Sequence, residues 1–136
     1  MNTDDHIPPE IGPHEGRELE LLLAGKKPVA MFSDVIPQSF ELPEKDFAPF
    51  VETGQLIRRE VRFSPYKPGR LGLRFLFYAL PEEEWRIGRL IEIHRAIHEN
   101  GKSTTPGIET EIGRLLGYLD HEIQFFVERF FNRIRG

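Results

Sequence analysis

The sequence feature that most constrains the fold is the stretch from Gln55 to Leu80, QLIRREVRFSPYKPGRLGLRFLFYAL. Its two halves, Leu56–Ser64 and Leu71–Leu80, alternate imperfectly between two faces with the period of two that is typical of a β-strand. Between them, PYKPGR contains two prolines and a glycine, which favour a turn. The stretch therefore predicts a β-hairpin at about residues 56–80.

The apolar residues of this hairpin also predict how its strands pair. Directly opposed residues of an antiparallel pair point to the same face, so placing Arg62 opposite Arg74 brings Phe63 opposite Leu73. One face then carries apolar residues that we expect to organise the core: Ile57, Val61, Phe63, Leu73, Phe75, Phe77 and Ala79. The other face carries Arg58, Glu60, Arg62, Arg74 and Tyr78.

The residues on either side of the hairpin predict one more strand and several helices. The apolar run Val29–Phe32 is expected to form the first strand, whose direction relative to the hairpin stays open, and Ser33–Pro43 is expected to be a loop. Helices are expected at Glu15–Ala24, within Pro43–Thr53 as a short or broken helix because of Pro49, from Pro81 to Gly101, from Pro106 to Gly117, and from Asp120 to Ile134.

These elements predict an α+β fold with a small, mostly antiparallel sheet of about three strands. The central hairpin is packed by helices, and the chain is expected to end in a helical hairpin. Residues 1–14 contain three prolines and few large apolar groups, so we expect a flexible N-terminal tail there. Residues 15–136 are expected to form a single domain.

Composition excludes several classes of function. The chain has no cysteine, which rules out disulfides, thiolate metal sites and cysteine nucleophiles. No apolar run approaches the roughly 18 to 20 residues that cross a bilayer. The polar and acidic N-terminus, MNTDDHIPPEIGPHEG, lacks the features of a secretion signal. We therefore expect a soluble, cytoplasmic protein with no membrane association.

The hairpin is the one strongly basic part of an acidic chain with a net charge of −4. From Arg58 to Arg74 there are six Lys or Arg residues against one acid, Glu60. Neighbouring acidic helices can neutralise this charge, but an acidic partner protein or nucleic-acid phosphates can also bind it. The candidate binding residues are Arg58, Arg62, Lys67, Arg70, Arg74, Tyr66 and Tyr78.

The helix predicted from Pro81 carries the candidate catalytic residues. His94 and His98 lie four residues apart and so share one helix face, with Glu83 three turns earlier on the same side. Histidines titrate near neutral pH and can transfer protons. Arg95 stands where a zinc-protease helix has glutamate, so no metal site is assigned and a third ligand would have to come from Asp120, His121 or Glu122. Partly buried, hydrogen-bonded core histidines are the structural alternative.

No pattern in the sequence decides whether the chain is an enzyme, and none identifies a cofactor. The interpretation we favour is a small interaction or regulatory module of bacterial type, which binds an acidic protein partner through the basic hairpin. The alternatives are a small enzyme or ligand binder with His94 and His98 lining a pocket between helix and sheet, and nucleic-acid binding through the hairpin. Phe125 and Phe131 border the apolar stripe of the last helix, where they could support a homodimer.

Overall fold

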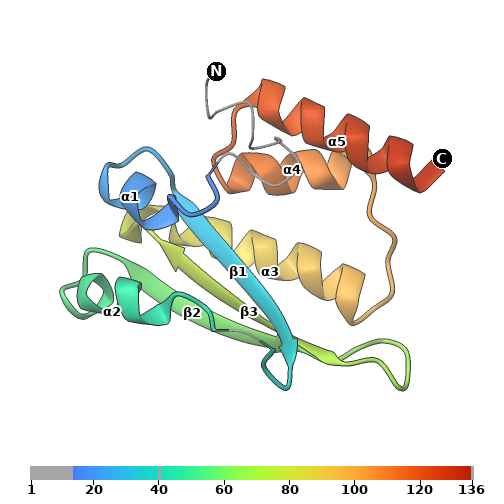
Figure 1. The fold of residues 1–136 in the computed structure, drawn as a ribbon, viewed down its shortest axis with the longest axis horizontal. Helices are drawn as coiled ribbons and strands as arrows, with labels where there is room; N and C mark the ends of the chain where they lie inside the picture. The colour runs from blue at the N-terminus through green and yellow to red at the C-terminus, as the bar shows by residue number, and fades with distance from the viewer. Residues whose placement is uncertain (1–13, 40, 136) are drawn as a thin grey trace.

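The computed structural model describes residues 14–39 and 41–135, so the tail predicted for residues 1–14 lies outside this part except for His14. Within it, five α-helices accompany a three-stranded antiparallel sheet, which confirms the α+β prediction (Figure 1). In chain order the elements are α1 (Glu18–Leu23), β1 (Val29–Ile36), α2 (Glu44–Glu52), β2 (Ile57–Phe63), β3 (Gly72–Ala79), the 3-10 turn η3 (Pro81–Glu83), α3 (Glu84–His98), α4 (Pro106–Leu115) and α5 (Asp120–Arg135).

The sheet has the order β1-β3-β2, with β3 in the centre and both neighbours antiparallel to it. The hairpin register is the predicted one, with Arg62 opposite Arg74 and Phe63 opposite Leu73. The direction of β1, which the sequence left open, is fixed by the pairing of Val29 with Ala79. The two strands β1 and β2 therefore form the edges of the sheet.

The first strand is longer than the sequence predicts. The expected loop at Ser33–Pro43 begins only after Ile36, because residues 33–36 continue to pair with β3. Asp34 is buried, and its carboxylate accepts hydrogen bonds from the Ser39 amide at 2.9 Å and the Ser39 hydroxyl at 2.7 Å. These bonds compensate the burial of the charge, so a polar residue remains within a strand.

The second helix agrees with the prediction of a short helix. The sequence predicts a short or broken helix around Pro49, and α2 is short but unbroken, with Pro49 inside it. Proline lacks the amide that would bond to the carbonyl four residues earlier, so one hydrogen bond of the helix is missing. Burial of Phe47 on the inner side of the helix offsets this cost.

The odd-numbered face of the hairpin forms the larger core, as predicted. Phe63, Phe75 and Phe77 are buried there against residues from α3 and α4. The helical contributors are Ile87, Leu90, Ile91, Ile93, Ile112, Leu115 and Leu116. The helices α3 and α4 therefore cover this face, while α5 packs on α4 as the second arm of the predicted C-terminal helical hairpin (Figure 1).

The even-numbered face is covered as well, which the sequence did not predict. Leu76 and Tyr78 of β3 pack there in a second core with Leu22 of α1 and Phe47 of α2. Tyr78 is only 1% exposed and stacks on Phe47 with ring centroids 4.2 Å apart. The sheet thus lies between two helical layers, and only part of its even-numbered face is polar.

Contacts between helices hold the C-terminal half together. The Thr105 side chain accepts a hydrogen bond from the Ile108 amide and caps α4. The Arg86 guanidinium donates to the carbonyls of Arg114 and Leu115 at the end of α4, where a cation complements the helix dipole.

No helix in residues 14–39 and 41–135 is long and apolar enough to cross a bilayer.

Candidate functional site

The hairpin turn is fixed against the end of α3. The Tyr66 amide donates to the carbonyl of His98 at 3.1 Å, and the Ser64 amide donates to the carboxylate of Glu99 at 2.9 Å. The Tyr66 ring covers Gly101, where an added Cβ would lie 2.8 Å from the ring. Gly101 also has φ +73, so glycine is favoured there by both its backbone conformation and the lack of space.

A pocket of about 750 Å³ lies beside this junction, between the turn, the loop at residues 101–104 and α5. Its apolar lining comes from elements that are distant in the sequence: Val35 of β1, Phe63 of β2, Leu73 of β3, Ile97 of α3 and Phe131 of α5, with Pro65 and Leu71 beside the turn. Both ends of the hairpin turn and the loop after α3 are thus needed to build it.

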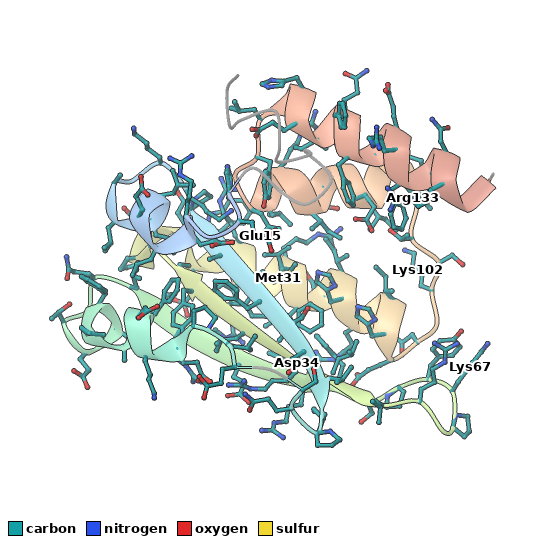
Figure 2. All side chains as sticks on the ribbon, viewed as in Figure 1. Glu15, Met31, Asp34, Lys67, Lys102 and Arg133 are labelled. Atoms are coloured by element: carbon teal, nitrogen blue, oxygen red, sulfur yellow. The ribbon has the colours of Figure 1, made fainter. Side chains whose placement is uncertain are left out.

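Three cations stand around this apolar lining: Lys67 and Arg70 from the turn, and Lys102 from the loop after α3. No Asp or Glu lines the pocket, and none of the three cations has an ion-pair partner in the part of the chain that the structure describes. Figure 2 shows Lys67 and Lys102 at the same end of the molecule, with Arg133 of α5. The side chains that line the pocket therefore carry a net positive charge.

Two backbone carbonyls at the end of α3 are hydrogen-bonded to the segments around the pocket. A helix C-terminus carries partial negative charge on its unbonded carbonyls. Here the Ala96 carbonyl accepts a hydrogen bond from the Lys102 amide at 2.9 Å, and the His98 carbonyl accepts one from the Tyr66 amide. Two carboxylates lie at the margin of the pocket, because the Glu99 carboxylate accepts a hydrogen bond from the Ser64 amide and the Glu109 carboxylate accepts one from the Thr104 hydroxyl at 2.6 Å.

His98 lines the pocket, and His94 lies behind it. Their rings stack with centroids 5.5 Å apart and planes 2° apart, and both rings also contact Phe75. Burial lowers the pKa of His94 to about 4, with a smaller contribution from His98, and burial also lowers the pKa of His98. Both imidazoles are therefore neutral at neutral pH.

The chemistry open to His94 is narrow. The side chain is 8% exposed, and neither ring nitrogen has a hydrogen-bond partner in the described part of the chain. A group with a pKa of about 4 is a weak base at neutral pH. These properties favour a packing role for His94 and leave His98 as the histidine that a ligand can reach.

The structure does not bring Glu83 to the two histidines. Glu83 ends the turn η3, where its carboxylate accepts a hydrogen bond from the Arg86 guanidinium at 2.7 Å. Ten residues of α3 lie between Glu83 and His94, which places the two about 16 Å apart along the helix axis. Residues 14–39 and 41–135 also contain no group of three or more His, Asp or Glu side chains that could hold a metal ion.

Arg58, Arg62 and Arg74 lie on the even-numbered face of the hairpin, away from the pocket lining. Arg74, whose side chain is 12% exposed, pairs with Glu44 at 2.8 Å and with Glu60 at 3.0 Å. Arg58 pairs with the same two carboxylates, and the arginines lower the pKa of both Glu44 and Glu60. An acid from α2 therefore neutralises much of this face, as one of the sequence-based alternatives described.

The predicted binding residues thus separate into two groups. Tyr66, Lys67 and Arg70 meet His98 and Phe131 at the pocket. The other group stays on the even-numbered face, where Arg62 is exposed and contacts Glu60 at 3.4 Å, and Tyr78 is buried. Phe125 is 40% exposed on α5, with the Arg129 guanidinium 5.3 Å from its ring centroid.

Sequence reasoning missed the loop residues that complete the pocket, Lys102, Ser103 and Thr104. The available signal was their position, since the polar run KSTTPG begins four residues after His98.

Comparison with protein-family models, curated proteins and solved structures gave no match for this chain. The functional interpretation therefore rests on the geometry of the pocket.

Proposed function

We propose that this protein is a binding module for a small amphipathic anion, which it holds in the pocket at the hairpin turn. The observation that carries the proposal is the convergence of Lys67, Arg70 and Lys102 around an apolar hollow, with no acid among the lining residues. Its volume of about 750 Å³ lies within the range of roughly 300–1,000 Å³ that small-ligand pockets occupy.

The arrangement suits a ligand with two parts. A carboxylate or phosphate group would meet the ammonium and guanidinium groups, which form charge-assisted hydrogen bonds with such anions. An apolar body would rest on Phe63, Leu73 and Phe131. Neutral His98 offers one hydrogen-bond donor or acceptor between these regions.

The pocket supports binding more strongly than catalysis. His98 has no carboxylate beside it among the lining residues, and Glu83 is engaged with Arg86 at the other end of α3. The arginine face supports a partner less strongly than the pocket does, because Arg58 and Arg74 already pair with Glu44 and Glu60. A concave site of this volume also fits a small molecule better than a polymer.

The experiment uses anilinonaphthalene sulfonate, an aromatic anion whose fluorescence reports binding in an apolar site. We expect saturable binding that octanoate and octyl phosphate displace and octylammonium does not. The double variant Lys67→Glu/Lys102→Glu should weaken probe binding by about tenfold or more, because two attractive charges become repulsive. The double variant Lys45→Glu/Arg59→Glu reverses two exposed charges outside the pocket, on α2 and β2, and serves as the charge-matched control.

Two results would contradict the proposal. One is equal displacement of the probe by octylammonium and octanoate, which would show that the apolar surface alone binds it. The other is an equal loss of affinity in Lys45→Glu/Arg59→Glu and the lysine variant, which would assign the effect to net charge. Thermal unfolding of each variant checks that the fold is intact.

A further inference from the structure

We propose a second binding surface: the outer edge of β1 and the groove beside it bind an extended basic peptide by strand addition. The strand order β1-β3-β2 leaves β1 at the edge of the sheet, with no strand of the described chain along its outer side (Figure 1). An exposed edge offers unpaired backbone groups, with which an extended segment can pair.

The direction of these backbone groups follows from two hydrogen bonds. The Leu80 amide donates to the carbonyl of Pro28 at 3.1 Å. The even-numbered residues of β1 therefore direct their backbone amides and carbonyls toward β3. The Val35 amide instead donates to the carboxylate of Asp34 at 2.7 Å. Because the direction alternates along a strand, Met31 and Ser33 present their amides and carbonyls at the outer edge.

The same two residues line a groove of about 970 Å³ that runs between α1, β1 and the start of α2. Its apolar lining includes Leu19 and Leu23 of α1, Phe32 of β1, and Leu42 and Phe47 beside and within α2. Leu23 is 42% exposed, a large share for an apolar side chain next to a hollow. A peptide paired with the edge would place alternate side chains against this surface.

Charge identifies the kind of peptide. Glu15, Glu18 and Asp46 line the groove and have no ion-pair partner within residues 14–39 and 41–135. Glu20 also lines it and meets only Arg17, at 3.5 Å. No Lys or Arg is among the lining residues, so the complementary occupant is basic.

The same argument disfavours two other occupants. Residues 1–13 of this chain carry Asp4, Asp5 and Glu10 and no Lys or Arg, so their side chains lack the positive charge that complements the groove. A second copy of the chain, paired edge to edge, would bring its own acidic groove against the first. Because Asp34 occupies the Val35 amide, the free part of the edge centres on Met31 and Ser33 and suits a short segment.

The test measures binding of a labelled peptide of alternating lysine and valine to the full chain by fluorescence anisotropy. We expect saturable binding, and no binding of the matched glutamate–valine peptide. N-methylation of alternate amides in the lysine–valine peptide should abolish binding, because it removes the donors that pair with the edge. The variant Glu15→Lys/Glu18→Lys should lose at least about tenfold in affinity, while Glu92→Lys on α3, on the opposite side of the sheet, should bind like the unaltered protein.

A second variant tests the strand itself. Met31→Pro removes an outward amide and leaves the β3 ladder in place, since proline is tolerated where an edge amide faces outward. We expect loss of peptide binding with retained binding of anilinonaphthalene sulfonate at the hairpin pocket, which separates this proposal from the proposed function. Equal affinity for N-methylated and unmethylated peptides would overturn strand addition even if Met31→Pro fails to fold. A dimer in sedimentation analysis that the peptide dissociates would assign the edge to a second copy.

Discussion

At the scale of single residues, His94 is the clearest departure from the usual rules of burial. Buried polar atoms nearly always have a hydrogen-bond partner, yet both nitrogens of His94 lack one in the described part of the chain. The surroundings are aromatic, with Phe75 at 4.6 Å and His98 at 5.5 Å between ring centroids. His94 therefore contributes as a flat apolar group while it is neutral and destabilises the fold once it is charged.

This gives a pH dependence with a defined sign. The pKa of His94 is lowered from 6.5 to about 4, so the unfolded chain binds its proton first as the pH falls. Stability is then lost between about pH 6.5 and pH 4, by on the order of 3 kcal/mol. We expect His94→Leu to remove this part of the loss, measured as the change in the free energy of unfolding in urea between neutral and mildly acidic buffer.

The control for His94→Leu is His121→Leu, which makes the same replacement at an exposed position of α5. His14 complicates the total change, because burial and the charge of Lys27 lower the pKa of its imidazole to about 4 as well. The decisive quantity is therefore the difference between the two variants. If they lose stability equally on acidification, His94 is not the group that titrates.

At the scale of elements, the turn between α4 and α5 is locked to the start of β1. Gly117 has φ +87, and an added Cβ would overlap the ring of Pro28. Gly54, after α2, has a similar φ of +81 but no atom within 4 Å of such a Cβ. Alanine substitutions at Gly54 and Gly117 therefore separate the effect of backbone strain, which both share, from the effect of steric overlap, which only Gly117 has.

We expect Gly54→Ala to lower the free energy of unfolding by about 1 kcal/mol, because alanine disfavours the left-handed conformation. Gly117→Ala should lower the free energy of unfolding by on the order of 3 kcal/mol. It adds to the same backbone strain an overlap with the rigid ring of Pro28, which pushes the two segments apart. Chemical unfolding of both variants measures the difference. Equal costs would mean that the α4–α5 turn can move away from Pro28 freely.

The elements that sequence reasoning located best are those whose pattern is local. Alternation fixed the hairpin and its register, since a shift by one residue would expose Phe63 and Phe75. The second half of β1 was missed because Ser33 and Asp34 are polar, and their pairing with β3 depends on residues about forty positions away. The even-numbered face was predicted to be polar because Leu76 and Tyr78 share it with Arg74. Only their tertiary contacts with α1 and α2 show that these two side chains are buried.

The candidate site shows the same limit. Sequence spacing grouped His98 with His94 and Glu83 along one helix, and Lys67 with the arginines of the hairpin. The structure groups His98 with Lys67 instead, because the turn folds back onto the end of α3. Such a contact has no periodic signature, so individual residues were found and their partners were not.

At the scale of the whole molecule, β3 is the element on which both helical layers depend. Its last five residues, 75–79, are all buried, so both of its faces are packed. Helices α1 and α2 cover one face, and α3 and α4 cover the other. Loss of either layer would expose apolar side chains of β3 to water, at about 25 cal/mol for each Å².

This arrangement predicts that the two cores unfold together. We expect Leu22→Ala in the smaller core and Leu90→Ala in the larger core each to cost about 2–5 kcal/mol. Both should lower the protection of β3 amides against hydrogen exchange by the free energy that each variant loses in urea unfolding. Leu119→Ala, which shortens an exposed side chain before α5, is the control and should change neither quantity greatly. If Leu22→Ala instead weakened protection in α1, β1 and α2 while β3 kept its full protection, the smaller core would be an independent layer. In that case the groove beside β1 would open while the hairpin pocket stayed folded. The reason is that β3 would lose its packing against α1 and α2 but keep its packing against α3 and α4.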